Sequence, residues 1–312
     1  MVVSRKRLIF AAILFVKLNL NSMKNKNFSH VLAIVCGMML CVASCEKMNL
    51  SQENEEANVF LSVGSFEQVP FSATRAAVAD VCTRISFLVY NSEGERIRKE
   101  DQKLEDSGFG HVAFMLPQGH YYLVVVAHSG EGNPTSTNSR KIAFTNKTGY
   151  TDTFLYADSL IVANTDVERS LSLKRIAAMV RFVAYDDIPA KSDSIRFYYT
   201  GGSGTFDAAA EGWGVVNSTQ VQWYELSHTE KKFEIYTIPH AGDEDVLKVT
   251  ASTYKGSKSD ASIVTEREIV DIPVKRNHIT TCRGYLFSPV YKHDVTITVD
   301  DDWDSDSIDF YF

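Results

Sequence analysis

From Val59 onward the chain alternates between short apolar runs and turn signals, a spacing typical of β-strands. The run 83–90 is rich in β-branched and aromatic residues, and the turn 91–94 that follows it has a glycine where a positive φ is needed. The run 120–127 is apolar throughout, which predicts a central strand buried on both faces. Almost no stretch has a helical period. The pattern therefore predicts an all-β protein made of β-sandwiches.

The strand-like segments fall into two blocks that meet near 161–167. The roughly 270 residues after residue 44 exceed a typical single domain, which favours two. We therefore expect two tandem β-sandwiches, an N-terminal one at 59–165 and a C-terminal one at 166–312. The polar, acidic stretch before them is typical of a flexible tether.

The segment that precedes the strands has the pattern of a secretion signal. Lys24 and Lys26 form a basic region, 31–40 is almost wholly apolar, and Val42-Ala43-Ser44 stands directly before Cys45. Small residues before a cysteine resemble the lipobox of bacterial lipoproteins, in which signal peptidase cleaves before the cysteine and its thiol carries diacylglycerol. We therefore expect a signal region at 1–44, lipidation at Cys45 and a lipidated tether at 45–58.

A second basic and apolar pattern lies upstream of Met23 and fits this interpretation poorly. Its apolar part, 8–16, is too short to cross a bilayer, which needs ~20 apolar residues. Since Met23 opens a complete signal by itself, we expect translation to start there; a longer or uncleaved N-terminus is the alternative. The mature chain is then anchored in a membrane by palmitate-type acyl chains rather than inserted.

The charge of the mature chain limits its electrostatic partners, and its cysteine count limits its disulfides. The signal region removes six basic and no acidic residues, so the 32 basic and 39 acidic residues of the chain become 26 and 39, a net charge of −13. This acidity argues against nucleic acid and anionic lipid head groups as electrostatic partners. Cys36 and Cys41 leave with the signal. Cys82 and Cys282 then remain either as a disulfide or, as we favour, as free thiols.

No pattern of catalytic residues, metal ligands or cofactor-binding glycines is present. The chain lacks H-E-x-x-H, G-x-S-x-G and P-loop motifs, and its eight histidines are dispersed. His120 and His128 flank the apolar run and are expected at its edges rather than as ligands. The acidic run 300–306 lacks the glycine and glutamate of an EF-hand loop, so a solvated loop is expected there. We therefore expect neither an enzyme nor a bound cofactor or metal.

Four stretches, together with the lipobox and the tether, resemble a known family. They are Arg84-Ile-Ser-Phe-Leu-Val-Tyr-Asn91, Leu116-Pro-Gln-Gly-His-Tyr-Tyr-Leu-Val124, Leu173-Lys-Arg-Ile-Ala-Ala-Met-Val180, and Pro273-Val-Lys-Arg-Asn-His-Ile-Thr280 with Gly284. In order and spacing they resemble the FimB-type anchor lipoproteins of Bacteroidetes type V fimbriae and their fimbrillin-like relatives. The resemblance implies paired transthyretin-like sandwiches, other fimbrial subunits as partners, and a role in cell adhesion as the lipid-linked anchor of a fimbrium.

The resemblance also implies assembly by strand exchange, in which a strand of one chain completes the sheet of the next. Two C-terminal segments have the alternating apolar residues that a donor strand requires, although closing their own domain is an equally favoured alternative. The residues are Val295, Ile297 and Val299 in the first segment, and Ile308, Phe310 and Phe312 in the second.

The polymerising fimbrillins that this chain resembles are cleaved after an arginine. Arg75 is the candidate site for such a cleavage here. Cleavage there would separate the lipid from the fold, which would make the chain a shaft or tip subunit instead of an anchor. A further alternative is a surface lipoprotein that binds glycan or a host ligand through the loop 201–213. In that loop 201–204 is expected to be flexible, and Trp213 to stack on a sugar or to lie in a core.

Overall fold

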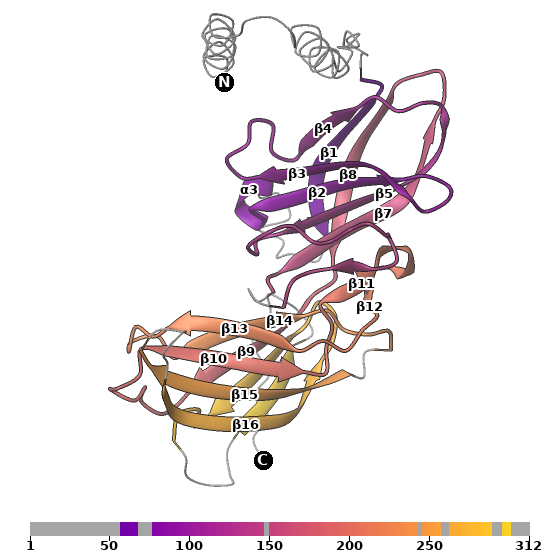
Figure 1. The fold of residues 1–312 in the computed structure, drawn as a ribbon. Coiled ribbons are helices and arrows are strands. Elements are labelled where there is room, and N and C mark those ends of the chain that lie inside the picture. The colour runs from indigo at the N-terminus through magenta and orange to yellow at the C-terminus, as the bar shows by residue number, and fades with distance from the viewer. Residues whose placement is uncertain are drawn as a thin grey trace, which may run out of the picture. The chain divides into compact units, whose positions relative to one another are not determined.

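The computed structural model describes residues 57–67, 77–146, 150–242, 245–256, 262–288 and 295–300. Over these ranges the chain is almost entirely β-structure (Figure 1), which confirms the all-β prediction. The described helical elements are one turn of α-helix, α3 (Val78–Val81), and one 3-10 turn, η2 (Ala208–Ala210). No helix in the described ranges is both long enough and apolar enough to cross a membrane.

The first sandwich is a seven-stranded sheet in the order β3-β2-β5-β7-β8-β1-β4. The sheet folds over between β7 and β8, which pair at only two register positions, and its two halves enclose one apolar core. The strands are β1 (Val59–Glu67), β2 (Arg84–Tyr90), β3 (Arg96–Lys103), β4 (His111–Phe114), β5 (Gly119–His128), β7 (Thr153–Val162) and β8 (Val167–Arg175).

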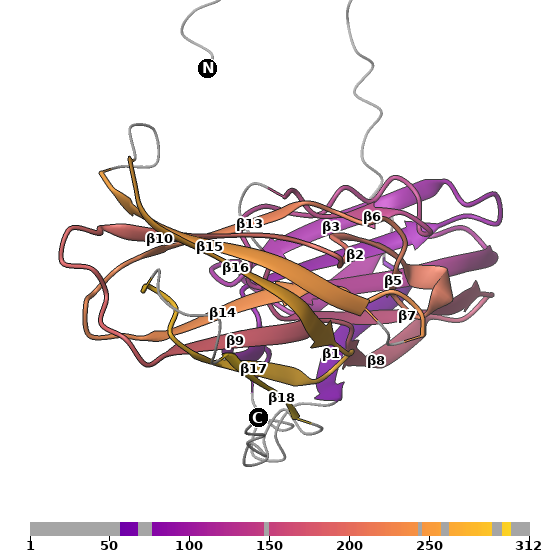
Figure 2. The same cartoon turned by 90° about the horizontal axis from the view of Figure 1, so that it is seen from below.

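The second sandwich has two separate four-stranded sheets, β13-β10-β15-β16 and β14-β9-β17-β18, which form the two layers seen in Figure 2. A second core lies between them, in which the rings of Phe182 and Phe197 stack with centroids 4.9 Å apart. The strands are β9 (Ala178–Ala184), β10 (Ser194–Thr200), β13 (Gln220–Glu225), β14 (Lys232–Thr237), β15 (Asp245–Lys255), β16 (Ser262–Val274), β17 (Ile279–Gly284) and β18 (Val295–Asp300).

Each sandwich pairs its opening strand in parallel with a late strand. β1 runs parallel to β8, and β9 runs parallel to β17. The strand at 167–175 therefore lies in the first sheet, whereas the sequence analysis assigned it to the second sandwich. Its buried residues Leu171 and Leu173 pack into the first core beside β1. Alternation identified the buried face of this strand but carried no information about its neighbour.

β5 is buried on both faces along its second half, as its continuous apolar run predicts. Leu123 and Val125 contribute to the first core, while Val124 and Val126 contribute to a third cluster. That cluster also contains residues from the small sheet β12-β11-β6, which joins segments of both sandwiches. Its strands are β6 (Ile142–Ala143), β11 (Thr205–Asp207) and β12 (Trp213–Gly214).

Candidate functional site

The tether leads directly into the first strand of the fold through Asn58. The side-chain amide of Asn58 donates to the Leu116 carbonyl at 2.8 Å and accepts from the Leu116 N–H at 2.9 Å. Its backbone N–H donates to Phe114 O at 3.0 Å, and its carbonyl accepts from Val167 N at 2.8 Å. Asn58, the last residue of the tether, is therefore hydrogen-bonded to the segments on both sides of β1.

β1 lies in the interior of its half of the sheet, between β4 and β8. Val59, Leu61, Val63 and Phe66 point into the first core and are at most 5 % exposed. A bulge at Gly64 shifts the register with β8, and a Cβ there would stand 2.1 Å from Ser170 Oγ. β1 is therefore a fully integrated strand, since burying four such side chains contributes about 6–12 kcal/mol of hydrophobic stabilisation.

Most of the predicted modification and donor residues lie outside the described residues. These are Cys45, Arg75, Ile308, Phe310 and Phe312. Arg75 stands eight residues after the end of β1 at Glu67 in the sequence. A cut after Arg75 would thus fall between β1 and every other strand that the structure describes.

Val295, Ile297 and Val299 lie in β18, at the edge of the sheet that contains β9 and β17. β18 pairs antiparallel with β17 of the same chain, with Ile297 opposite Cys282. Ile297 is half-buried and packs against the second core. In this structure the segment adds a strand to its own sandwich, which is one of the two roles expected for it; donation to another chain stays a prediction.

Two of the stretches behind the family resemblance meet at the junction of the sandwiches. The Arg175 guanidinium is 2 % exposed and binds both carboxylate oxygens of Asp152 at 2.8–3.0 Å. It also donates to Asn277 Oδ1 at 2.9 Å, while the Asn277 N–H donates to Ala177 O. These stretches therefore hold the two sandwiches together, a role that the sequence alone did not indicate.

The glycine-rich loop 201–204 is packed rather than freely exposed. Gly202, Ser203 and Gly204 are buried, and a Cβ on Gly204 would stand 1.6 Å from Tyr150 Oη. The expectation of a flexible loop is therefore wrong. Glycine is needed at these positions because neighbouring groups approach the backbone too closely for a side chain. Trp213 is half-buried.

The ring of Trp213 is also covered by a neighbouring side chain. The Arg276 guanidinium lies 3.4 Å from its centroid and donates to the Glu211 carbonyl at 2.9 Å. A cation–π contact of this kind already occupies one face of the indole. The Trp213 loop is thus a poor candidate for stacking on a sugar.

The two remaining cysteines are free thiols buried in different cores. Cys82 belongs to the first core and Cys282 to the second. Burial raises the pKa of each thiol to about 12, so both stay protonated and unreactive at neutral pH. Because the two thiols lie in different cores, they are not joined by a disulfide.

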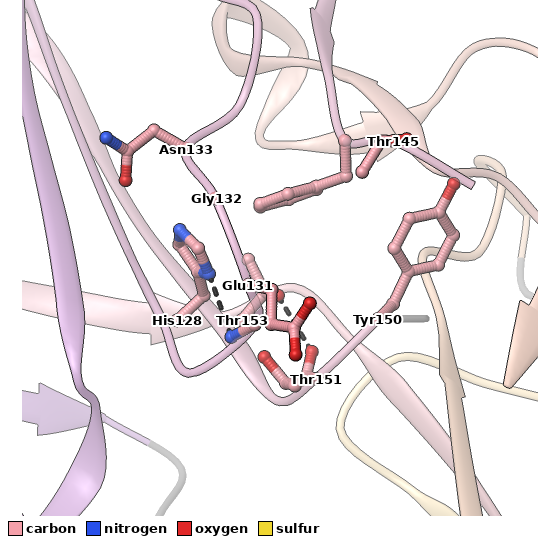
Figure 3. A pocket seen from close by; sticks show the side chains of 10 residues that line it. His128, Glu131, Gly132, Asn133, Thr145, Tyr150, Thr151 and Thr153 are labelled. Carbon is pink, nitrogen blue, oxygen red and sulfur yellow. Dashed lines mark hydrogen bonds between the residues drawn. The ribbon is translucent and has the colours of Figure 1, made fainter. Parts of the chain in front are cut away.

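A cavity of about 50 Å³ lies at the end of β5, beside His128 (Figure 3). The sequence analysis expected His128 to be an edge residue, but its side chain is 1 % exposed. Burial, and secondarily the Arg84 cation, lowers the pKa of His128 to about 4. Burial also raises the pKa of Tyr150, on the far side of the cavity, to about 12. Both groups are therefore neutral at pH 7.

Comparison with solved structures finds similar proteins from species of Bacteroides, Porphyromonas and Parabacteroides. A candidate polysaccharide-binding protein (DUF1812) of Bacteroides thetaiotaomicron is 11 % identical, with 78 % of this chain and 96 % of that chain covered and a TM-score of 0.47. The fimbrial anchor protein Mfa2 of Porphyromonas gingivalis is 12 % identical, with coverages of 81 % and 99 % and a TM-score of 0.42. A fimbrial assembly protein of Parabacteroides distasonis is 10 % identical, with coverages of 81 % and 97 % and a TM-score of 0.38.

No functionally curated protein matches the sequence. A family model does match it, over residues 51–310, which include the last residues of the tether and both sandwiches. The chain thus belongs to the protein family of unknown function DUF6562.

Proposed function

We propose that this protein is the lipid-linked subunit that holds a surface fimbrium to the outer membrane. The observation that supports the proposal is the position of β1. The tether that follows Cys45 leads, through Asn58, into a strand that lies between two others and supplies four residues to the first core. A lipid attached at Cys45 would then be connected to the interior of the fold rather than to a loose end.

This connection suits a protein that must resist pulling. Tension on the tether enters the fold at the N-terminal end of β1, which is hydrogen-bonded to both β4 and β8. The eight register pairs with β8 and four with β4 share that load. The several acyl chains of a lipoprotein would provide a correspondingly strong attachment to the membrane, because one chain gives only marginal binding.

An anchor would keep β1, whereas a shaft or tip subunit would lose it by cleavage. Cleavage after Arg75 would separate β1 from the strands with which it pairs, and would leave the remaining sandwich with a gap between β4 and β8. In the proposed anchor this site stays uncut, and β1 fills its own place in the sheet. The chain would then join the fimbrium by another surface or as a strand donor.

For strand donation, we propose the segment that contains Ile308, Phe310 and Phe312 as the donor. The preceding strand, β18, is already paired with β17. Deleting residues 307–312 should then release fimbriae from the cell while the melting temperature of the protein stays unchanged. A sharp fall in melting temperature would instead mean that the segment completes its own sandwich.

Fimbrial retention tests the proposed function directly. Cells with the wild-type protein should keep their fimbriae, and cells with Cys45→Ala should shed them into the medium. Cys82→Ala is the matched control, since it removes a thiol from the first core rather than from the lipidation position. If Cys45→Ala cells keep as many fimbriae as wild-type cells, the anchoring function is wrong.

A further inference from the structure

The outer face of the strands β4, β1 and β8 carries an open groove of about 650 Å³. These three strands are neighbours in the first sheet (Figure 1), with β1 in the middle. Alternate residues of each strand point away from the first core, so the groove lies on the side of the sheet opposite that core. Its volume is within the range of about 300–1,000 Å³ that is typical of sites for small molecules.

Six side chains on this face form an array of two rows, each of which crosses all three strands. The rows are Ala113, Phe60 and Glu168, and His111, Ser62 and Ser170. Neighbouring strands lie about 4.8 Å apart and alternate residues of one strand about 7 Å apart, so the array measures about 10 Å by 7 Å. The array therefore suits a ligand the size of one monosaccharide.

The floor of the groove is made largely of backbone. Leu61 and Val112 line the groove although their side chains are buried in the first core, so it is their backbone that the groove exposes. Small side chains such as Ala113 and Ser62 leave this floor open. Phe60 stands beside it with 38 % of its surface exposed. A ligand that lies on the floor would therefore contact the ring of Phe60.

The polar side chains of the array have no partner inside the described part of the protein. None of them makes a side-chain hydrogen bond or an ion pair there; they are Ser62, His111, Glu168 and Ser170. Arg169, the one lysine or arginine among the residues that line the groove, is engaged elsewhere. Its guanidinium donates to the Ser159 carbonyl at 2.7 Å and lies 3.9 Å from the Asp158 carboxylate. The groove thus offers a carboxylate, an imidazole and hydroxyls, without a free guanidinium or ammonium group.

These groups restrict the class of ligand. An anion would meet the Glu168 carboxylate with no lysine or arginine to pair with. A purely apolar molecule would cover that carboxylate without a hydrogen bond. A protein partner needs about 800 Å² of surface on each side, whereas the array covers about 70 Å². A saccharide fits both kinds of group, since its C–H face can pack on Phe60 while its hydroxyls donate to Glu168 and bond with Ser62 and His111.

We propose that this groove binds one pyranose ring of an uncharged glycan. Phe60 stacks on the C–H face of the sugar, and Glu168 accepts hydrogen bonds from its hydroxyls. The site is separate from the Trp213 loop. It also does not depend on the anchoring function, so the failure of either proposal leaves the other standing.

Saturation-transfer NMR on the full-length lipoprotein tests the proposal, in micelles of a detergent without a sugar head group. The probes are the methyl glycosides of D-glucose, D-galactose and D-mannose, each beside its uronate counterpart. At least one uncharged glycoside should bind, with the strongest saturation on its ring C–H protons. Its uronate should bind about fivefold more weakly, because Glu168 repels the second carboxylate. Absence of binding by all three uncharged glycosides, or tighter binding of the uronates, would overturn the proposal.

Substitutions of Phe60 test the stacking contact. Phe60→Ala should weaken binding about tenfold, whereas Phe60→Trp keeps an aromatic ring and should retain it. Tyr198→Ala is the matched control, since Tyr198 is an aromatic residue of β10 in the other sandwich with a similar exposure of 40 %. Equal binding by Phe60→Ala and Tyr198→Ala would contradict the assignment.

Two further variants keep the test decisive if Phe60→Ala fails to fold. Ala113→Trp places a large ring over the groove from an exposed position and should abolish binding. Glu168→Gln, also at an exposed position, should remove the preference for the uncharged glycoside over its uronate. Unchanged binding by Ala113→Trp, or an unchanged preference in Glu168→Gln, would place the sugar elsewhere and refute the site.

Discussion

Asn58 is the residue whose replacement tests most sharply how the tether is joined to the fold. Asn58→Ala removes the two side-chain hydrogen bonds to Leu116, whose N–H and C=O then lack their partners. Leu116 is 1 % exposed, so water cannot readily replace the lost amide. A net loss of about 1–1.5 kcal/mol for each of the two hydrogen bonds predicts a total destabilisation of about 2–3 kcal/mol.

Urea denaturation of the unlipidated full chain, with Cys45→Ala as the common background, measures this effect. Asn217→Ala is the control, because Asn217 is exposed and its replacement should change the free energy of unfolding by no more than about 0.5 kcal/mol. In force spectroscopy with the handle on the N-terminal tether, Asn58→Ala should also lower the unfolding force. If Asn58→Ala matches the control within error in both assays, the role given to Asn58 is refuted.

Three further changes test the packing described above. Asp152→Asn should lower the free energy of unfolding by about 3 kcal/mol in urea denaturation, because it leaves the buried Arg175 cation uncompensated; a loss below 1 kcal/mol would contradict this. Gly204→Ala should cost about 2 kcal/mol or more in the same assay, since its Cβ would meet Tyr150 Oη at 1.6 Å, and a neutral effect would show that the loop is loose. As the pH drops from 6.5 to about 4, His128 should lower the free energy of unfolding of the wild type by about 3 kcal/mol, because the unfolded state binds the proton at a higher pH than the folded state. His128→Asn should lack this part of the loss. Identical pH profiles of the two proteins would contradict a buried neutral imidazole.

The strands were predictable because each carries its own local pattern. The apolar run 120–127 identified β5 as buried on both faces, and the turn before Glu95 was readable from Gly94, which adopts φ +81°. The pairing of these strands was not readable in the same way. β8 joins β1 across about a hundred residues of intervening chain, and alternation is equally compatible with either sandwich.

The site residues that sequence reasoning missed are those whose roles depend on distant neighbours. His128 follows an apolar strand and resembles an edge residue, yet Phe144 covers it from another segment. Arg175 and Asn277 lie about a hundred residues apart and meet only because the sandwiches pack together. Trp213 has flanking glycines that suit an exposed ring, but Arg276 covers it. Burial by remote segments leaves no mark on the local sequence.

The intact mass of the mature protein, recovered from the outer-membrane fraction and measured by mass spectrometry, tests the anchoring account most directly. The account predicts a chain that begins at an acylated Cys45 and still contains β1. A chain that begins at Ala76 would lack both the lipid and β1, and would contradict the account.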